Sequence, residues 1–154
     1  APTRQSVSSA IGGICLSLAL GAGSPVVFVP LERFTLAWTH SIERVRWEED
    51  YAVVPDGARW QLLAVQTRIK GSGAGMEPPP DAQWRGGWYV YAPANRHPAM
   101  LTLSRSAFVP DYELCTAEGC RPLANHLPSD GGTTVVRACG AHALRPPSES
   151  ESSG

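Results

Sequence analysis

The stretch WQLLAVQTRIK, residues 60–70, decides the fold class. Two kinds of side chain alternate along it: the apolar or β-branched set is Leu63, Val65, Thr67 and Ile69, and the polar set is Gln66, Arg68 and Lys70. Because successive side chains of an extended chain point to opposite faces, this alternation predicts a strand with one buried face. No stretch of the chain shows the periodicity of an amphipathic helix to compete with it.

Short apolar runs of the same kind fill the rest of the chain, separated by turn-forming residues. They cover residues 14–20, 25–29, 34–40, 45–54, 88–92, 100–104 and 133–139. The chain also holds 15 glycines and 14 prolines, which break helices and punctuate strands. The sequence therefore predicts an all-β, single-domain sandwich or partly open barrel of about eight or more short, mainly antiparallel strands.

The domain boundaries follow from where apolar residues stop. Residues 1–13 are predicted to be a leader that is flexible at its start, residues 14–140 a single β domain, and residues 141–154 a disordered tail. The segment at 10–23 fits either a strand or the remnant of an export signal, and we prefer the strand. It is too short and too rich in glycine to cross a membrane, and no transmembrane span is predicted.

Two strands are expected to carry different chemistry on their two faces. The bulky face of the first holds Phe34, Leu36, Trp38 and His40. The second presents Val45, Trp47, Tyr51 and Val53 on one side and Arg46, Glu48 and Asp50 on the other. Both are therefore predicted to be half-buried.

The four cysteines are an even number without the CxxC spacing of zinc or thioredoxin-type redox sites. The turn formers between Cys115 and Cys120 would place these two residues opposite each other, so they are predicted to form a disulfide. Cys15 and Cys139 remain as a second candidate pair, which geometry must decide. Disulfides persist in oxidising compartments, so a periplasmic or other extracytoplasmic location is expected, with any membrane association passing through a partner.

Charge and histidine spacing exclude several classes of ligand. The net charge is -1, from 13 basic and 14 acidic residues, so no field favours a nucleic acid. The four histidines, His40, His97, His126 and His142, show no HxH or HExxH spacing, and no metal site is predicted. No motif indicates a cofactor.

Three segments combine residue types that suggest a site: 38–51, 68–80 and 86–91. Within them stand the segment WTHSIE at 38–43, WEE at 47–49, GSGAGM at 71–76 and Gly87-Trp88. This succession resembles the bacterial family called domain of unknown function 1850, over residues 14 to 140. Members of that family are often encoded beside, or joined to, subunits of TAXI-type TRAP transporters, which take up organic acids. The resemblance implies a transporter context and no mechanism.

The first segment offers an acid–base constellation without a complete catalytic signature. Adjacent His40 and Ser41 face opposite sides of an extended chain, so a Ser–His dyad is disfavoured. A bulge near Ile42 would bring His40 to Glu43, and Glu43 with Glu48 would form a carboxylate pair or accept a nearby arginine. The alternatives are a core histidine beside a solvated strand face, a ligand-binding site, or a small hydrolase or isomerase using His40, Glu43 and Glu48.

The glycine-rich segment at 71–76 lacks the GK[ST] ending of a nucleotide-binding loop. Its glycines allow backbone N–H groups to turn toward one anionic oxygen, and Arg68 and Lys70 precede it. The alternative is a plain turn with Met76 filling the core. Among the five tryptophans, Trp84 and Trp88 are expected to be exposed.

No enzyme signature is strong enough to classify the chain as a catalyst. We expect an extracytoplasmic accessory or binding module that acts with a TAXI-type TRAP transporter, contacting either its membrane subunit or an organic-acid-like anion. The alternatives are the small hydrolase or isomerase and a purely structural β domain. The predicted binding residues are Trp38, His40, Ser41, Glu43, Glu48, Arg68, Gly71, Gly73, Gly75, Met76 and Trp88.

Overall fold

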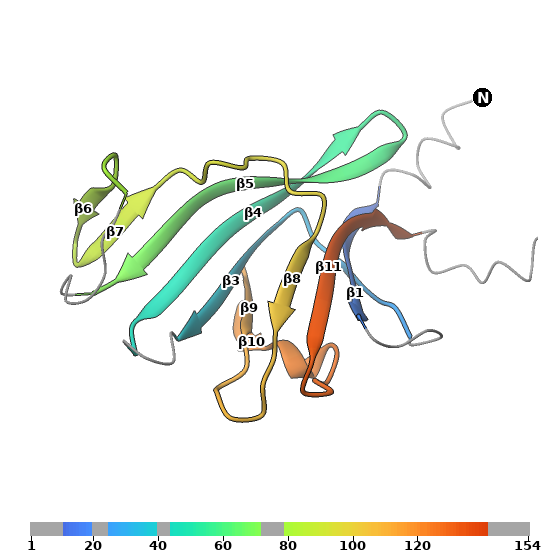
Figure 1. The fold of residues 1–154 in the computed structure, drawn as a ribbon. Helices are drawn as coiled ribbons and strands as arrows, with labels where there is room; N and C mark the ends of the chain where they lie inside the picture. Colours follow the sequence, from blue (N-terminus) through green and yellow to red (C-terminus); the bar gives the residue numbers. More distant parts are fainter. Residues whose placement is uncertain (1–10, 20–24, 40–43, 72–78, 142–154) are drawn as a thin grey trace, which may run out of the picture.

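The computed structural model describes residues 11–19, 25–39, 44–71 and 79–141. In these ranges the chain forms a sandwich of two antiparallel sheets, as predicted (Figure 1). The strands are β1 (Gly12–Leu18), β2 (Val27–Pro30), β3 (Arg33–Thr39), β4 (Arg46–Asp56), β5 (Arg59–Lys70), β6 (Gln83–Arg85), β7 (Trp88–Tyr91), β8 (Leu101–Ser104), β9 (Glu113–Thr116), β10 (Gly119–Pro122) and β11 (Thr133–Gly140). A single 3-10 turn, η1 (Leu123–Asn125), follows β10.

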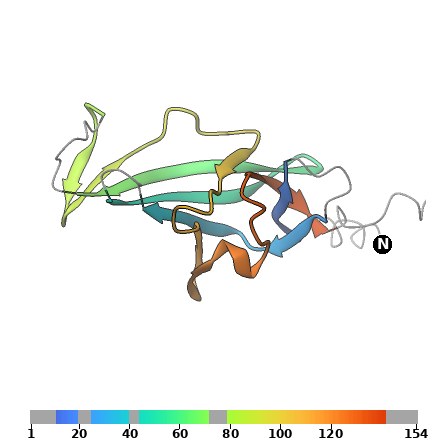
Figure 2. The ribbon, with the colours of Figure 1, turned by 60° about the horizontal axis from the view of Figure 1, so that its bottom comes forward.

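The two sheets differ in size. The smaller has the strand order β2-β1-β11-β8, and the larger has the order β10-β9-β3-β4-β5-β7-β6. In Figures 1 and 2 alike, the β6–β7 hairpin lies at the end of the large sheet far from β1 and β11. The smaller sheet therefore covers only part of the larger one. We call the side of the large sheet that faces the small sheet its inner face, and the opposite side its outer face.

The core lies where the sheets overlap. It is formed by inward side chains of both sheets, and its most deeply buried members are Ile14, Leu16, Leu36, Leu62, Leu123 and Val136. Residues 12–18 pair with β11, and residues 13–16 also pair with β2 on the other side, so this part of the ambiguous 10–23 segment is a strand. Its flanking residues 10 and 20–23 lie outside the described ranges.

A β-bulge in β5 corrects the predicted faces of the stretch that decided the fold. Asp50 pairs with Gln66 but Tyr51 pairs with Ala64, so Val65 has no partner on β4. The extra residue reverses the alternation, and Ala64 is buried with the core while Val65 is not. The predicted inner position is therefore right for Thr67 and Ile69 and wrong for Val65 and for Leu63, whose neighbours Leu62 and Ala64 point inward instead.

Both disulfides are formed. Cys115 and Cys120 face each other across the β9–β10 hairpin, as predicted. Cys15 and Cys139 also pair, with their Cα atoms 5.9 Å apart, and join the neighbouring strands β1 and β11 of the small sheet. No described helix is long and apolar enough to cross a membrane.

Candidate functional site

The predicted site residues divide between the two faces of the large sheet. Strand register places Trp38 beside Trp47 on the inner face, whereas Glu48 pairs with Ala37 and Arg68 on the outer face. Trp88 also lies on the outer face, opposite Lys70. Gly71 follows the end of β5. Trp38 therefore does not share a pocket with Glu48 and Arg68.

The remaining predicted residues lie outside the described ranges: His40, Ser41, Glu43, Gly73, Gly75 and Met76. The strand ends that lead into these two segments are near each other, because Trp47 pairs with Trp38 on one side and with Ile69 on the other. Both segments thus leave the same end of the large sheet.

The outer face carries a ladder of ion pairs across four strands. Arg68 donates to both oxygens of Asp50 and to Oε1 of Glu48, the latter from Nη2 at 2.8 Å. Arg46 bonds Glu48 Oε2 at 2.7 Å and Glu113 Oε1 at 2.9 Å. Three carboxylates surround two guanidinium groups, so Arg68 has already used Nε, Nη1 and Nη2 within the protein.

The ladder sets the acidity of its carboxylates. Burial raises the pKa of Glu48 and of Asp50, but other influences outweigh it and lower both below their ordinary values. For Glu48 these are the hydrogen bonds and charges of Arg46 and Arg68; for Asp50 they are Arg68 and the hydrogen bonds from Thr35 and Gln66. Glu48 is therefore held ionised and is a weak proton acceptor. The same arginines see their own pKa raised by these carboxylates.

Replacing Arg68 with glutamine should raise the pKa of Asp50 from its lowered value. With the guanidinium gone, burial still raises this pKa, and only the hydrogen bonds from Thr35 and Gln66 remain to lower it. Since a lowered carboxylate pKa stabilises the fold above about pH 4, the loss should be about 1–2 kcal/mol at pH 7 and should vanish as Asp50 becomes protonated at low pH. Carboxyl NMR titration and urea unfolding would measure both effects.

Arg46→Gln is the matched control, because Arg46 contacts Glu48 and Glu113 but not Asp50. It should raise the pKa of Glu48 and leave that of Asp50 unchanged. An Asp50 pKa that stays as low in Arg68→Gln as in the unmodified chain would contradict the ladder.

Among the described residues, the part of the inner face that the small sheet does not cover carries large apolar side chains rather than ion pairs. A row of large, mostly aromatic side chains crosses the sheet there. Neighbouring members pair across strands β3, β4, β5, β7 and β6, and Tyr112, which comes just before β9, contacts the first of them. The members are Tyr112, Trp38, Trp47, Ile69, Tyr89 and Trp84. We call this set the aromatic row. Trp38 stacks on Trp47 with ring centroids 5.8 Å apart, and Trp84 meets Tyr89 edge-on at 4.7 Å.

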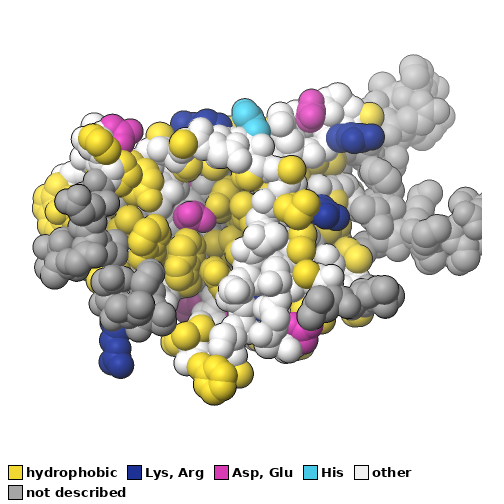
Figure 3. Space-filling model, in the orientation of Figure 1, with side chains coloured by type: hydrophobic (Ala, Val, Ile, Leu, Met, Phe, Trp, Pro, Cys, Tyr) yellow, Lys and Arg dark blue, Asp and Glu magenta, His cyan; other side chains and the backbone are white. Residues whose placement is uncertain are grey.

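The aromatic row is only partly buried. Ile69 alone is fully covered, Trp84 is 55% exposed, and the other members lie between. Trp84 was expected to be exposed and is; Trp88, on the outer face, is half-buried beneath the Lys70 ammonium, 5.1 Å from its ring centre. Figure 3 shows hydrophobic side chains gathered over the large sheet beside β8 and β11, with an acidic group among them.

Two cavities lie elsewhere in the described part of the molecule. One of about 690 Å³ separates the β2–β3 connection from the β9–β10 hairpin and is lined by residues such as Leu31, Arg33 and His126. The other, of about 430 Å³, opens on the outer face next to Asp50 and Arg68. Both mix acidic and basic groups, so neither is specific for an anion.

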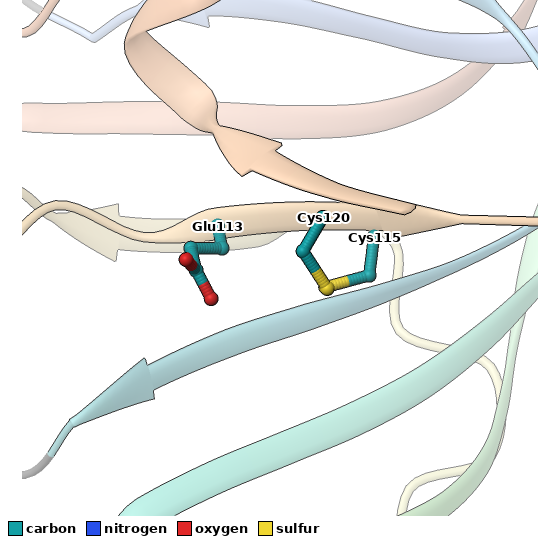
Figure 4. Close-up of side chains that lie close together, drawn as sticks. All are labelled: Glu113, Cys115 and Cys120. Atoms are coloured by element: carbon teal, nitrogen blue, oxygen red, sulfur yellow. A yellow bond between two sulfur atoms is a disulfide. The ribbon is translucent and has the colours of Figure 1, made fainter. Parts of the chain in front are cut away.

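A metal centre gains no support from the disulfide hairpin. Glu113 lies beside Cys115 and Cys120, with possible ligand atoms within 4.8 Å of one another (Figure 4). The two sulfur atoms are bonded to each other, so neither is the thiolate that a metal such as zinc requires.

A family model described as "Domain of unknown function (DUF1850)" matches residues 34–123. The match runs from β3 to the end of β10 and so contains the large sheet with both of its faces. No match was found among curated proteins or among solved structures.

Proposed function

Because the chain belongs to the DUF1850 family, we propose that it is a non-catalytic, extracytoplasmic module that binds a TAXI-type TRAP transporter through the aromatic row of its large sheet. The observation that carries this proposal is that, among the described residues, the small sheet leaves the aromatic row partly exposed. Exposed Trp and Tyr side chains are costly to hydrate and are enriched in the energetic centres of protein interfaces.

The size of the aromatic row favours a protein over a small ligand. Five neighbouring strands contribute one residue each, and Tyr112, next to β9, adds the sixth. With strands about 4.8 Å apart, the row extends over roughly 24 Å, which exceeds the length of a small organic acid. A surface of this width matches a protein contact.

The charged residues of the outer face give less support to cargo binding or catalysis. Arg68 would have to leave Glu48 and Asp50 to hold a carboxylate ligand. Glu48, with its lowered pKa, is poorly suited to remove a proton. The two disulfides agree with work in an oxidising compartment.

The test is binding of the purified chain to the transporter's membrane subunits held in lipid nanodiscs. Replacing Trp84 and Tyr89 together with alanine should weaken binding about 10- to 100-fold, because both side chains belong to the aromatic row. The matched control is Trp88→Ala, which removes a tryptophan of the same hairpin from the opposite face. It should leave the affinity within about twofold.

Two results would contradict the proposal: no complex with the unmodified chain, or equal losses for the two variants. Thermal unfolding of each variant separates loss of contact from loss of fold. Trp84 and Tyr89 lie outside the main core, so both variants should remain folded.

A further inference from the structure

Glu49 is an acidic side chain on the inner face, where most of the described neighbours are apolar or aromatic. Glu49 pairs with Leu36 on β3 and with Thr67 on β5, and Thr67 pairs in turn with Tyr91. Because alternate residues of β4 share a face, Glu49 points to the same side as Trp47 and Tyr51. A carboxylate therefore lies next to the aromatic row, on the side nearer the small sheet.

The environment of Glu49 is made of aromatic rings. Its Oε1 accepts a hydrogen bond of 2.7 Å from the Tyr51 hydroxyl. Burial and then the charge of Glu49 raise the pKa of Tyr91 and of Tyr112. Tyr91 pairs with Thr67, which is itself the strand partner of Glu49. Tyr112 in turn packs on Trp38, with ring centroids 5.5 Å apart.

Glu49 differs from its two neighbours in having no basic partner among the described residues. Glu48 and Asp50, on the outer face, are each paired with an arginine. Within residues 11–19, 25–39, 44–71 and 79–141, no Lys or Arg nitrogen lies within 4.0 Å of the Glu49 carboxylate. The half-buried negative charge is thus left without a counter-ion in this part of the chain.

We propose that Glu49 and the surrounding aromatic rings receive the side chain of an arginine or lysine from the protein that docks on the aromatic row. This inference rests on the proposed function, since it takes the inner face to be a binding surface. The argument is charge complementarity: a carboxylate and the faces of Trp and Tyr rings all attract a cation. Such a pair would fix the register of the partner, which apolar contact alone does not do.

The first test uses a basic side chain alone as the probe. N-acetyl-arginine amide and N-acetyl-lysine amide are titrated into the isotope-labelled chain, and the tryptophan indole N–H signals are followed by NMR. Both probes should shift the signals of Trp38 and Trp47 in a saturable way, and the uncharged N-acetyl-glutamine amide should not. Glu49→Gln keeps an acceptor for the Tyr51 hydroxyl and should weaken binding of both basic probes about tenfold or more.

The matched control is Glu48→Gln, the adjacent acid on the opposite face. It should bind the basic probes as tightly as the unmodified chain. Equal binding of the glutamine probe, or unchanged binding in Glu49→Gln, would overturn the inference.

The second test separates this inference from the proposed function. Glu49→Gln and the Trp84→Ala/Tyr89→Ala variant are compared for binding to the transporter's membrane subunits at two salt concentrations. Loss of binding in both variants, with weaker binding of the unmodified chain at high salt, supports both ideas. Loss only in the aromatic variant retains the docking surface and rejects the basic partner residue. Glutamate-dependent binding of the arginine probe without any transporter binding rejects the transporter and retains the cation site.

Discussion

Replacing Cys15 and Cys139 together with alanine should lower the free energy of unfolding by about 4–5 kcal/mol. The two residues are 124 positions apart in sequence, so their bond closes nearly the whole domain into one loop. Breaking it returns the entropy of that loop to the unfolded chain, and the entropy grows with the logarithm of loop length. The midpoint of thermal unfolding should fall by about 10–20 °C.

The second disulfide is the matched control. Cys115 and Cys120 are separated by 5 positions, and the same reasoning gives about 2 kcal/mol for their replacement with alanine. Guanidinium unfolding of the two double variants would compare them directly. Equal losses would show that local contacts, rather than loop length, determine what each bond contributes.

The strands and the hairpin disulfide were predictable because both depend on neighbours in sequence. Alternation of apolar and polar residues reports which face of a strand is buried, and it located the inner face of β4 at Trp47, Tyr51 and Val53 correctly. The turn between Cys115 and Cys120 brings these residues together with no help from the rest of the fold. Strand alternation and a hairpin turn can therefore be recognised from the sequence alone.

The bulge at Val65 was not predictable for the same reason. A bulge changes the pairing between two strands, and no residue type at positions 64–66 marks it. Partners distant in sequence were equally hidden. Arg46 reaches Glu113 only because β9 pairs with β3, a neighbour relation that strand patterns do not specify.

The acid on the inner face did leave a signal in the sequence. Glu49 shares the parity of Trp47, Tyr51 and Val53, so strict alternation places a charged residue on the apolar side of β4. The adjacent Glu48, which obeys the alternation, was instead predicted as a site residue in a carboxylate pair with Glu43. A charge that violates the pattern is more informative than one that obeys it, because burying it has a cost that some partner must offset.

The charged residues on the two faces of the large sheet thus have different roles. On the outer face, acids and arginines satisfy one another, which stabilises the sheet and leaves little capacity for a ligand. On the inner face, a single described acid stands among rings with no described basic partner. The predicted site residues Glu48 and Arg68 lie on the outer face, and Trp38 lies on the inner face.

Arg105→Met should lower the free energy of unfolding by about 3–5 kcal/mol at pH 7. The side chain of Arg105 is 1% exposed, and its guanidinium donates to both oxygens of Asp111 and to the buried hydroxyl of Thr134. Methionine fills similar space but donates nothing, so a charge and a hydroxyl lose their partner. Urea unfolding would measure the loss, and Arg105→Met/Asp111→Asn should recover part of it by removing the stranded charge.

The loss of stability in Arg105→Met should depend on pH, and the substitution should also disturb the aromatic row. Burial raises the pKa of Asp111, but the hydrogen bond and charge of Arg105, together with backbone amides, outweigh it, and the folded-state pKa is lowered. A lowered carboxylate pKa stabilises the fold above about pH 4, so the difference between the unmodified chain and Arg105→Met should shrink as pH falls and Asp111 becomes protonated. Asp111 also accepts the Ala124 amide, and Tyr112 accepts the Leu123 amide at 2.8 Å. Releasing Asp111 should therefore loosen Tyr112, which packs beside Trp38 in the aromatic row. Arg105→Met should then weaken partner binding even where the variant remains folded. An unchanged affinity would show that Arg105 and Asp111 do not hold the docking surface in place.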